Sequence, residues 1–256
     1  MTALRIQFRV LSALVLRETR TTFGASQAGY VWAIITPSAS TAVLVILFTA
    51  AGRHAPFGVS LALFFGLGVL TLELFTKLTN ALMTVFEANK ALLAYPVIKE
   101  TDVLFARAIL IVASYLLIMT IFLAGLMAAG LAGMPTYLEE VLAAFCVTSL
   151  LGFGAGAGNA ILVSYWESWR HVEKILTRPL FFLSGLFYVP SYLPEQALDW
   201  LKWNPVLHCV EWMRHGWYAN YDSRVLDKQY LISVTLFIVF LSLLCERLTR
   251  DGRCSR

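Results

Sequence analysis

The sequence predicts an all-α integral membrane protein with six transmembrane helices. Of its 256 residues, 59% are apolar and 14% are charged, and the mean hydropathy is +0.71, which excludes an ordinary soluble domain. Several apolar stretches approach the roughly 20 residues that a helix needs to cross a bilayer. Basic residues are concentrated in alternate connections between these stretches. That alternation is typical of a chain that crosses a membrane repeatedly.

The chain is expected to begin with an amphipathic helix on the membrane surface, within residues 1–29. This stretch is too charged to span a bilayer and suits a helix lying on an anionic leaflet. Its arginines are predicted to contact lipid headgroups, and recognition of an anionic lipid or a sugar acid is the alternative. These residues are Arg5, Arg9, Arg17 and Arg20.

The six spans are expected at residues 31–51, 61–85, 103–131, 137–163, 175–189 and 230–244. The fifth is the shortest, about 22 Å of helix, and Arg178-Pro179 lies near its start. In the second span, Glu73 precedes Lys77 by one helical turn, the favourable order for an ion pair. Ionisable groups at this depth are costly unless paired or wetted. The two residues are therefore either a mutually neutralised pair or part of a substrate path.

A glycine-rich run, GFGAGAG at residues 152–158, lies within the fourth span. It cannot cradle a phosphate from inside an apolar helix. We expect it to allow close packing between helices.

A polar segment with embedded apolar residues joins the second and third spans. Asn89 can cap a short surface helix, which Pro96 would end or kink. Leu92 and Tyr95 are expected to share one face, with Leu93 alongside, and to dock against another protein. The alternative is an interfacial loop whose apolar residues enter the headgroup region.

Two short helices are expected before the last span, within residues 190–217, meeting at Asn204-Pro205. Neither is apolar enough to cross a bilayer, so both should enter only its outer half. Four of the seven tryptophans lie close together here, and they form either an aromatic belt at the headgroups or a gate and stacking surface for sugar rings. They are Trp200, Trp203, Trp212 and Trp217.

The basic residues predict that both termini are cytoplasmic. With the N-terminus inside, the inner segments hold fourteen basic residues and the outer loops five, which agrees with the positive-inside rule. Cys209 should then react with an impermeant thiol reagent from outside, and Cys254 from inside.

Signatures of catalysis or metal binding are not found. The sequence contains no Walker, HExxH or GxSxG motif, and its four cysteines lack metal-ligand or disulfide spacing. His208 and His215 have no convincing third ligand. We expect no enzyme activity, cofactor or metal in this chain.

Four stretches, in this order and spacing, resemble an ABC-2 type exporter permease over essentially the full length. They are LRETRTTFGASQAGYVWAIITP (16–37), NKALLAYPVIKETDVLFAR (89–107), SGLFYVPSYLP (184–194) and NPVLHCVEWMRHGW (204–217). Within that family the chain looks most like the capsular polysaccharide exporters, with the O-antigen and teichoic-acid permeases as cousins. The resemblance implies one transmembrane domain, residues 1–256, with an interface helix (1–29), a coupling segment (86–102) and periplasmic gate helices (190–217).

The resemblance also implies a function and partners. The chain would be the permease of an ATP-driven exporter that moves a lipid-linked capsular polysaccharide across the bacterial inner membrane. A separate ABC ATPase subunit, present in two copies, would bind ATP and Mg²⁺. The permease would be a homodimer in contact with membrane lipids, a periplasmic adaptor or co-polymerase and an outer-membrane channel, and nucleic acid is not an expected partner.

Two sets of site residues follow from this resemblance. The coupling segment would dock on the ATPase through Asn89, Leu92, Leu93, Tyr95, Pro96 and Ile98. The substrate path or gate would draw on Phe48, Glu73, Lys77, Phe182, Tyr188, Trp200, Trp203, His208 and Trp212.

Other functions stay open at this point. A secondary transporter would be expected to show internal repeats and buried acids along an ion path, and only Glu73 qualifies. A membrane-embedded transferase would need clustered aspartates or histidines, and the sequence has none. Among exporters, O-antigen and teichoic-acid permeases are the alternatives to a capsule exporter.

Overall fold

The computed structural model describes residues 3–23, 28–95 and 98–254, and in these residues the chain is helical, with no strand. Among the described residues, four helices are long and apolar enough to cross a membrane: α3 (Leu61–Met83), α6 (Glu100–Ala128), α7 (Leu138–Tyr165) and α12 (Lys228–Cys254). They correspond to the second, third, fourth and sixth predicted spans. An all-helical membrane protein is therefore confirmed.

The structure does not confirm the count of six spanning helices. In place of the first predicted span lies α2 (Ala28–Ala50), of which Ser38–Ala50 is a shorter apolar helix within the described residues. The predicted fifth span is divided into α8 (Trp169–Thr177) and α9 (Leu180–Leu183), and the chain is then non-helical up to the short 3₁₀-helix η1 (Pro190–Tyr192). Pro179 has no N–H to continue the helix, and Gly185, with a φ of +70°, turns the chain away.

The shorter predicted elements are also present. The N-terminal helix is α1 (Ala3–Phe23), which packs against α6. The coupling segment contains α4 (Val85–Ala88) and α5 (Lys90–Leu93). Two short helices, α10 (Glu195–Leu201) and α11 (Pro205–Trp217), precede the last span as predicted. The boundary at Asn204-Pro205 is confirmed, because the Asn204 side chain caps α11 by accepting a 3.0 Å hydrogen bond from the Val206 N–H.

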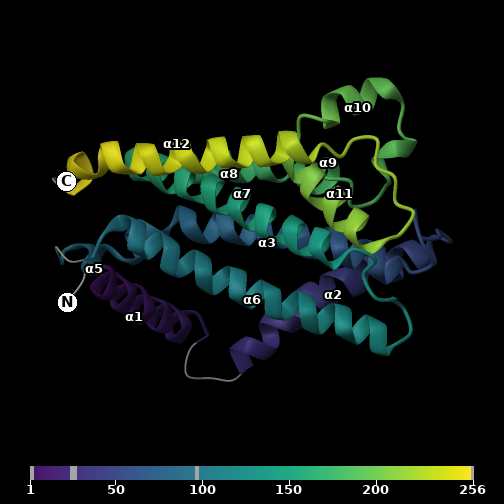
Figure 1. Ribbon diagram of the computed structural model, residues 1–256, viewed down its shortest axis with the longest axis horizontal. Coiled ribbons are helices and arrows are strands. Elements are labelled where there is room, and N and C mark those ends of the chain that lie inside the picture. Colours follow the sequence, from purple (N-terminus) through teal and green to yellow (C-terminus); the bar gives the residue numbers. More distant parts are fainter. Residues whose placement is uncertain (1–2, 24–27, 96–97, 255–256) are drawn as a thin grey trace.

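The long helices run side by side along the long axis of the molecule (Figure 1), with α7 packed between α3 and α12. In α3, 72% of the most apolar stretch is buried, whereas the corresponding figure for α6 and for α12 is 22%. The centre of the bundle is therefore α3, and α6 and α12 present apolar faces outward, as lipid-facing helices would.

The glycine-rich run of α7 packs as predicted. A Cβ atom added to Gly156 would lie 2.8 Å from Leu82 of α3, and one added to Gly154 would lie 2.9 Å from Val239 of α12. Successive glycines of the run thus pack alternately against α3 and α12. In addition, the Ser242 hydroxyl of α12 donates a 2.8 Å hydrogen bond to the Gly154 carbonyl. Close approach of three helices at this point requires residues without side chains.

The two ends of the bundle carry different elements. Figure 1 shows α1, α5 and the C-terminal end of α12 at one end, and α10 and α11 near the other. We call these the inner and outer ends, following the orientation that the basic residues predict.

Labelling of Cys209 cannot test this orientation, because Cys209 is fully buried and its burial raises the pKa of the thiol to about 12. The expectation that it is accessible from outside is wrong. The side chain of Cys254 lies outside the described residues. Two exposed positions replace them: Val59, in the turn before α3, and Tyr95, in the coupling segment.

We predict opposite labelling of these two positions. Val59→Cys and Tyr95→Cys are each placed in a background in which Cys146, Cys245 and Cys254 are serine. An impermeant maleimide should label the Val59→Cys protein in intact spheroplasts and the Tyr95→Cys protein only after permeabilisation. The parent with Cys209 alone should stay unlabelled in both conditions. Labelling of both positions from one side would contradict the orientation.

Candidate functional site

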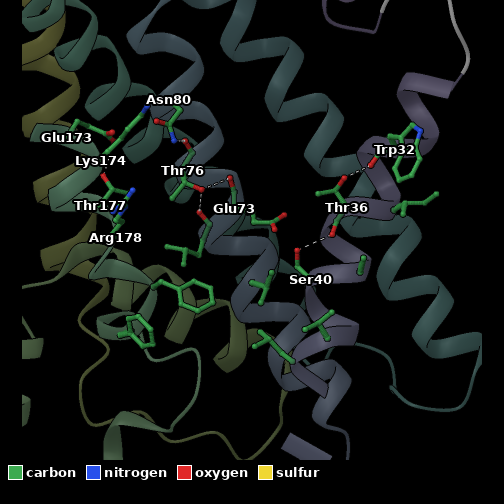
Figure 2. Close-up of a pocket in the computed structure, with 18 residues that line it drawn as sticks. Trp32, Thr36, Ser40, Glu73, Thr76, Asn80, Glu173, Lys174, Thr177 and Arg178 are labelled. Atoms are coloured by element: carbon green, nitrogen blue, oxygen red, sulfur yellow. Dashed lines mark hydrogen bonds between the residues drawn. The ribbon is translucent and has the colours of Figure 1, made fainter. Parts of the chain in front are cut away.

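An open groove of about 1320 Å³ lies between α2, α3, α8 and α9, as shown in Figure 2. Its floor is apolar and includes Val43, Leu44, Val69 and Leu72. Three aromatic side chains, Trp32, Phe181 and Phe182, also line it. Its polar residues are Thr36, Ser40, Glu73, Thr76, Asn80, Glu173, Lys174, Thr177 and Arg178. Such a surface can hold a chain with both polar and apolar faces.

The walls of the groove differ in charge. On the α3 wall, Glu73 is half-buried among residues whose hydroxyls bond to their own helix, such as Thr76, which donates to the Leu72 carbonyl at 3.0 Å. On the α8 wall, Lys174 and Arg178 are exposed and form no ion pair within the described residues. Figure 2 shows Glu73 and Thr76 of α3 in the middle of the view, between the α8 residues on one side and the α2 residues on the other. The α8 wall thus carries two exposed cations beside one carboxylate, that of Glu173.

Lys77 does not share this groove. Its side chain is exposed and does not line the cavity, and the described residues show no ion pair between it and Glu73. Both interpretations of Glu73, as the partner of Lys77 and as part of a substrate path, therefore stay predictions.

A second, smaller pocket of about 320 Å³ lies at the outer end of α2. It brings together two predicted path residues, Phe48 and Tyr188, and adds Phe187, Arg53 and His54. The guanidinium carbon of Arg53 lies 5.8 Å from the centre of the Phe48 ring. This pocket is therefore aromatic and basic.

Three phenylalanine rings connect the groove to this outer pocket. The Phe187 ring lies 5.9 Å from Phe182, in the groove, and 5.7 Å from Phe48, with which it is stacked at an interplanar angle of 6°. We call Phe182, Phe187 and Phe48 the aromatic ladder. The sequence analysis did not single out Phe187. The one feature of the sequence that could have indicated it is its position between Phe182 and Tyr188, which were both predicted to line the path. The ladder joins two cavities that the sequence could not connect.

Arg214 holds the non-helical chain that carries Phe187. Its side chain is fully buried, and it donates hydrogen bonds of 2.7 Å to the Gly185 carbonyl and 3.2 Å to the Leu186 carbonyl. Its guanidinium carbon lies 3.7 Å from the centre of the Phe64 ring of α3. A Cβ atom on Gly68 would lie 3.0 Å from the same guanidinium. One cation therefore fastens three separate segments together.

Glu211 supplies the opposite charge. Its carboxylate lies 3.4 Å from the Arg214 guanidinium and is fully buried. It also accepts hydrogen bonds of 2.7 Å from the Tyr221 hydroxyl and 2.6 Å from the Ser223 hydroxyl. Hydrogen bonds of this kind offset part of the cost of burying an ion pair, although the Arg214 Nε has no partner among the described residues.

The four tryptophans do not form one surface. Trp200 and Trp203 are 84% and 67% exposed, whereas Trp212 and Trp217 are buried. The Trp212 indole N–H donates a 2.5 Å hydrogen bond to Glu140, and Lys228 lies 5.4 Å from its ring centre. Only Trp200 and Trp203 are placed to meet a ligand.

His208 is buried and connects two segments at the outer end. Its Nδ1 accepts a hydrogen bond from the Asp227 N–H at 3.1 Å, and its Nε2 lies 2.8 Å from the Lys202 carbonyl oxygen. This pattern suits a neutral ring that donates from Nε2. The His208 ring therefore holds the end of α10 next to the start of α12, beside a cleft of about 770 Å³ that Trp203 also lines.

The coupling segment differs in detail from its prediction. Leu92, Leu93 and Ile98 are half-buried and pack on the core, while Tyr95 is 64% exposed. The two side chains thus differ in burial, and a docking face shared by Leu92 and Tyr95 stays a prediction. Asn89 stands at the N-cap position of α5, but its side chain makes no cap hydrogen bond. Pro96 lies outside the described residues.

Asn89 instead takes part in a polar cluster with α1 and α6. Its side-chain oxygen accepts a hydrogen bond from Arg17, which also bonds to Glu18 at 2.9 Å. Glu18 is buried, and Arg107 of α6 donates to it twice, at 2.8 and 3.0 Å. Arg17 is thus a structural residue as well as a candidate for lipid contact.

Burial alone would raise the pKa of Glu18, but the Arg107 and Arg17 guanidinium groups outweigh burial and lower it. Glu18 therefore stabilises the folded chain at neutral pH, and this contribution is lost as the pH falls through the lowered pKa. Of the other surface arginines, Arg9 and Arg20 are exposed, and the side chain of Arg5 lies outside the described residues.

Comparison with known proteins gives one family and several relatives. The sequence profile of the ABC-2 type transporter family matches residues 9–218. Two polysialic acid transport proteins KpsM of Escherichia coli are 31% and 32% identical to this chain, each over 96% of it and 95% of their own length. The capsule polysaccharide export inner-membrane protein CtrC of Neisseria meningitidis serogroup A is 23% identical over 94% of this chain and 91% of its own. BexB of Haemophilus influenzae, with the same description, is 25% identical over 85% and 82%.

Removing the buried Arg214 charge should destabilise the fold. Arg214→Met leaves Glu211 without its cation and should cost about 3–5 kcal/mol, measured as a fall in the thermal unfolding midpoint of the purified protein. The double variant Arg214→Met with Glu211→Gln should recover part of the loss, because no charge is then stranded. Arg224→Met, at an exposed arginine, is the matched control. Equal losses at Arg214 and Arg224 would show that the buried pair has no special role.

Proposed function

The chain belongs to the ABC-2 type transporter family, and on this premise we propose that it is the permease subunit of an exporter that moves a lipid-linked capsular polysaccharide across the bacterial inner membrane. The observation that carries the proposal is the aromatic ladder, which joins the groove to the outer pocket. Such a connection suits a long molecule that passes from one cavity to the next. The relatives support the substrate class, since they are named for polysialic acid transport or capsule polysaccharide export.

The chemistry of this path fits a charged sugar polymer. Sugar rings have apolar C–H faces that pack on aromatic rings, and a path must hold its cargo at several weak sites, because tight binding would stall it. Basic residues stand at both ends of the ladder: Lys174 and Arg178 in the groove, and Arg53 in the outer pocket. This distribution favours an acidic polymer, whether capsule, O-antigen or teichoic acid.

The energy would come from a partner. In the proposed complex, two ATPase subunits bind ATP and Mg²⁺, and the coupling segment docks on them. Both termini of the permease then lie in the cytoplasm, and α10 and α11 face the periplasm, where an adaptor and an outer-membrane channel continue the path. Since the groove is open to its surroundings, a second copy of the chain would complete the wall around the polymer.

The coupling segment can be tested at Tyr95. Tyr95→Asp places a charge on an exposed side chain of the proposed ATPase interface, where burial of that charge opposes binding. Affinity for the ATPase should fall about thirtyfold or more, as at an interface hot spot, with normal membrane insertion. The measurement is co-purification of the ATPase with the permease, followed by the ATPase rate of the complex.

Two matched variants interpret this result. Tyr137→Asp, at an exposed tyrosine of the α6–α7 connection, should leave ATPase binding unchanged. Leu92→Asp should instead lower stability, because Leu92 packs on the core. Undiminished binding by Tyr95→Asp would show that the segment is only an interfacial connection. Failure of the unmodified chain to bind any ATPase would overturn the proposed function itself.

The tryptophans give a second test, in which the structure separates stability from transport. Trp200→Ala and Trp203→Ala remove exposed rings, so they should reduce export without lowering the unfolding midpoint. Trp212→Ala removes a buried ring and should cost about 3–5 kcal/mol. Export is followed as surface polysaccharide and as polymer accumulating in the cytoplasm. If Trp200→Ala and Trp203→Ala both export normally, these rings are membrane anchors and not part of a gate.

A further inference from the structure

The helix α8 has few connections to the rest of the molecule. Its main helix contacts are with its chain neighbours α7 and α9. At its start, the Trp169 indole donates a 2.9 Å hydrogen bond to Asn159 of α7. Four of its nine side chains are exposed and four are half-buried, and Glu173 is its one buried residue. Its position must therefore depend strongly on any contact that it makes with a distant segment.

One such contact is an ion pair between Arg170 of α8 and Glu87 of α4. Glu87 lies two residues before Asn89. The Asn89 side chain accepts a hydrogen bond from Arg17 of α1. The start of the coupling segment is thus attached both to α1 and to α8. Because both partners of the Arg170–Glu87 pair are partly exposed, with 28% and 55% of their side chains accessible, the pair should contribute little to stability.

The same helix leads directly into the groove. Arg170, Lys174 and Arg178 are spaced four residues apart, so they lie along one face of the helix. Lys174 and Arg178 line the groove, whereas Arg170 reaches the coupling segment. A helix of nine residues is about 13 Å long and moves as a unit. A displacement at its Arg170 end therefore moves the two groove cations.

We propose that the Arg170–Glu87 ion pair is the positioning contact through which the coupling segment controls the place of Lys174 and Arg178 in the groove. The inference rests on the proposed function, because it assumes that an ATPase moves the coupling segment. Arg170 acts through α8 and need not touch the polymer. Its role is to change how strongly the groove holds an anionic chain when the ATPase subunits close and open.

A charge exchange tests the proposal. Permease and ATPase are reconstituted together in proteoliposomes, and two quantities are measured: export of an acidic lipid-linked polysaccharide and ATP hydrolysed per polymer exported. Arg170→Glu should retain ATPase assembly but reduce export roughly two- to thirtyfold, the range of known coupling effects, so that more ATP is used per polymer. Adding Glu87→Arg restores an ion pair of opposite direction and should restore export to near the unmodified level.

The control is Glu167→Arg, a charge reversal at an exposed acid three residues before Arg170, which should leave the ATP used per polymer unchanged. The proposal is overturned if Arg170→Glu exports with the normal ATP use, or if adding Glu87→Arg brings no recovery. A purely structural role would instead lower the unfolding midpoint without changing the ATP used per polymer. These outcomes differ from failure of the proposed function, in which the unmodified complex itself would not assemble or export.

Discussion

The buried charge of Arg214 is the constraint on which the outer half of the molecule depends. An arginine with no exposed surface can hydrogen-bond only to the protein, and here its terminal NH₂ groups reach Glu211 and the carbonyls of Gly185 and Leu186, while its Nε has no partner among the described residues. Irregular backbone at membrane depth is stable only where protein or water satisfies its polar groups. The cation therefore permits the chain to leave the helical path after α9. Because Phe187 follows directly, the same interaction sets the ring that joins the two cavities.

A second buried charge organises the inner end in a comparable way. Glu18 lies between Arg17 and Arg107, and through Arg17 it is connected to Asn89 in the coupling segment. Between the two charge clusters, α3 and α7 approach closely through glycines. Charged contacts thus position the segments at the two ends, and tight apolar packing provides a stiff frame between them.

The sequence predicted the features that depend on local pattern. Apolar length identified four spans, the Asn204-Pro205 dipeptide marked the boundary between the two short helices, and the glycine run indicated close packing. Features set by tertiary contacts were missed. The Asn89 side chain could have capped a helix by accepting a hydrogen bond from a backbone N–H. It instead accepts a hydrogen bond from Arg17, in a helix distant in the sequence. The tryptophans are close in sequence, yet α11 turns Trp212 inward toward Glu140 of α7. For Arg214, the sequence offered only one local indication of an ion pair, the acid Glu211 one helical turn earlier. Its other partners lie in segments distant from it in the sequence.

The most direct test of the proposed path is a cross-link between the aromatic ladder and the moving polymer. A benzophenone analogue of phenylalanine is placed at Phe187, with Phe240, an exposed residue of α12, as the control position. During ATP-driven export in membranes, illumination should join the polysaccharide to the protein at Phe187 and not at Phe240, and the cross-link should require ATP. If the polymer instead reacts equally at Phe240, or reacts near Trp203 but never at Phe187, the ladder is not the path.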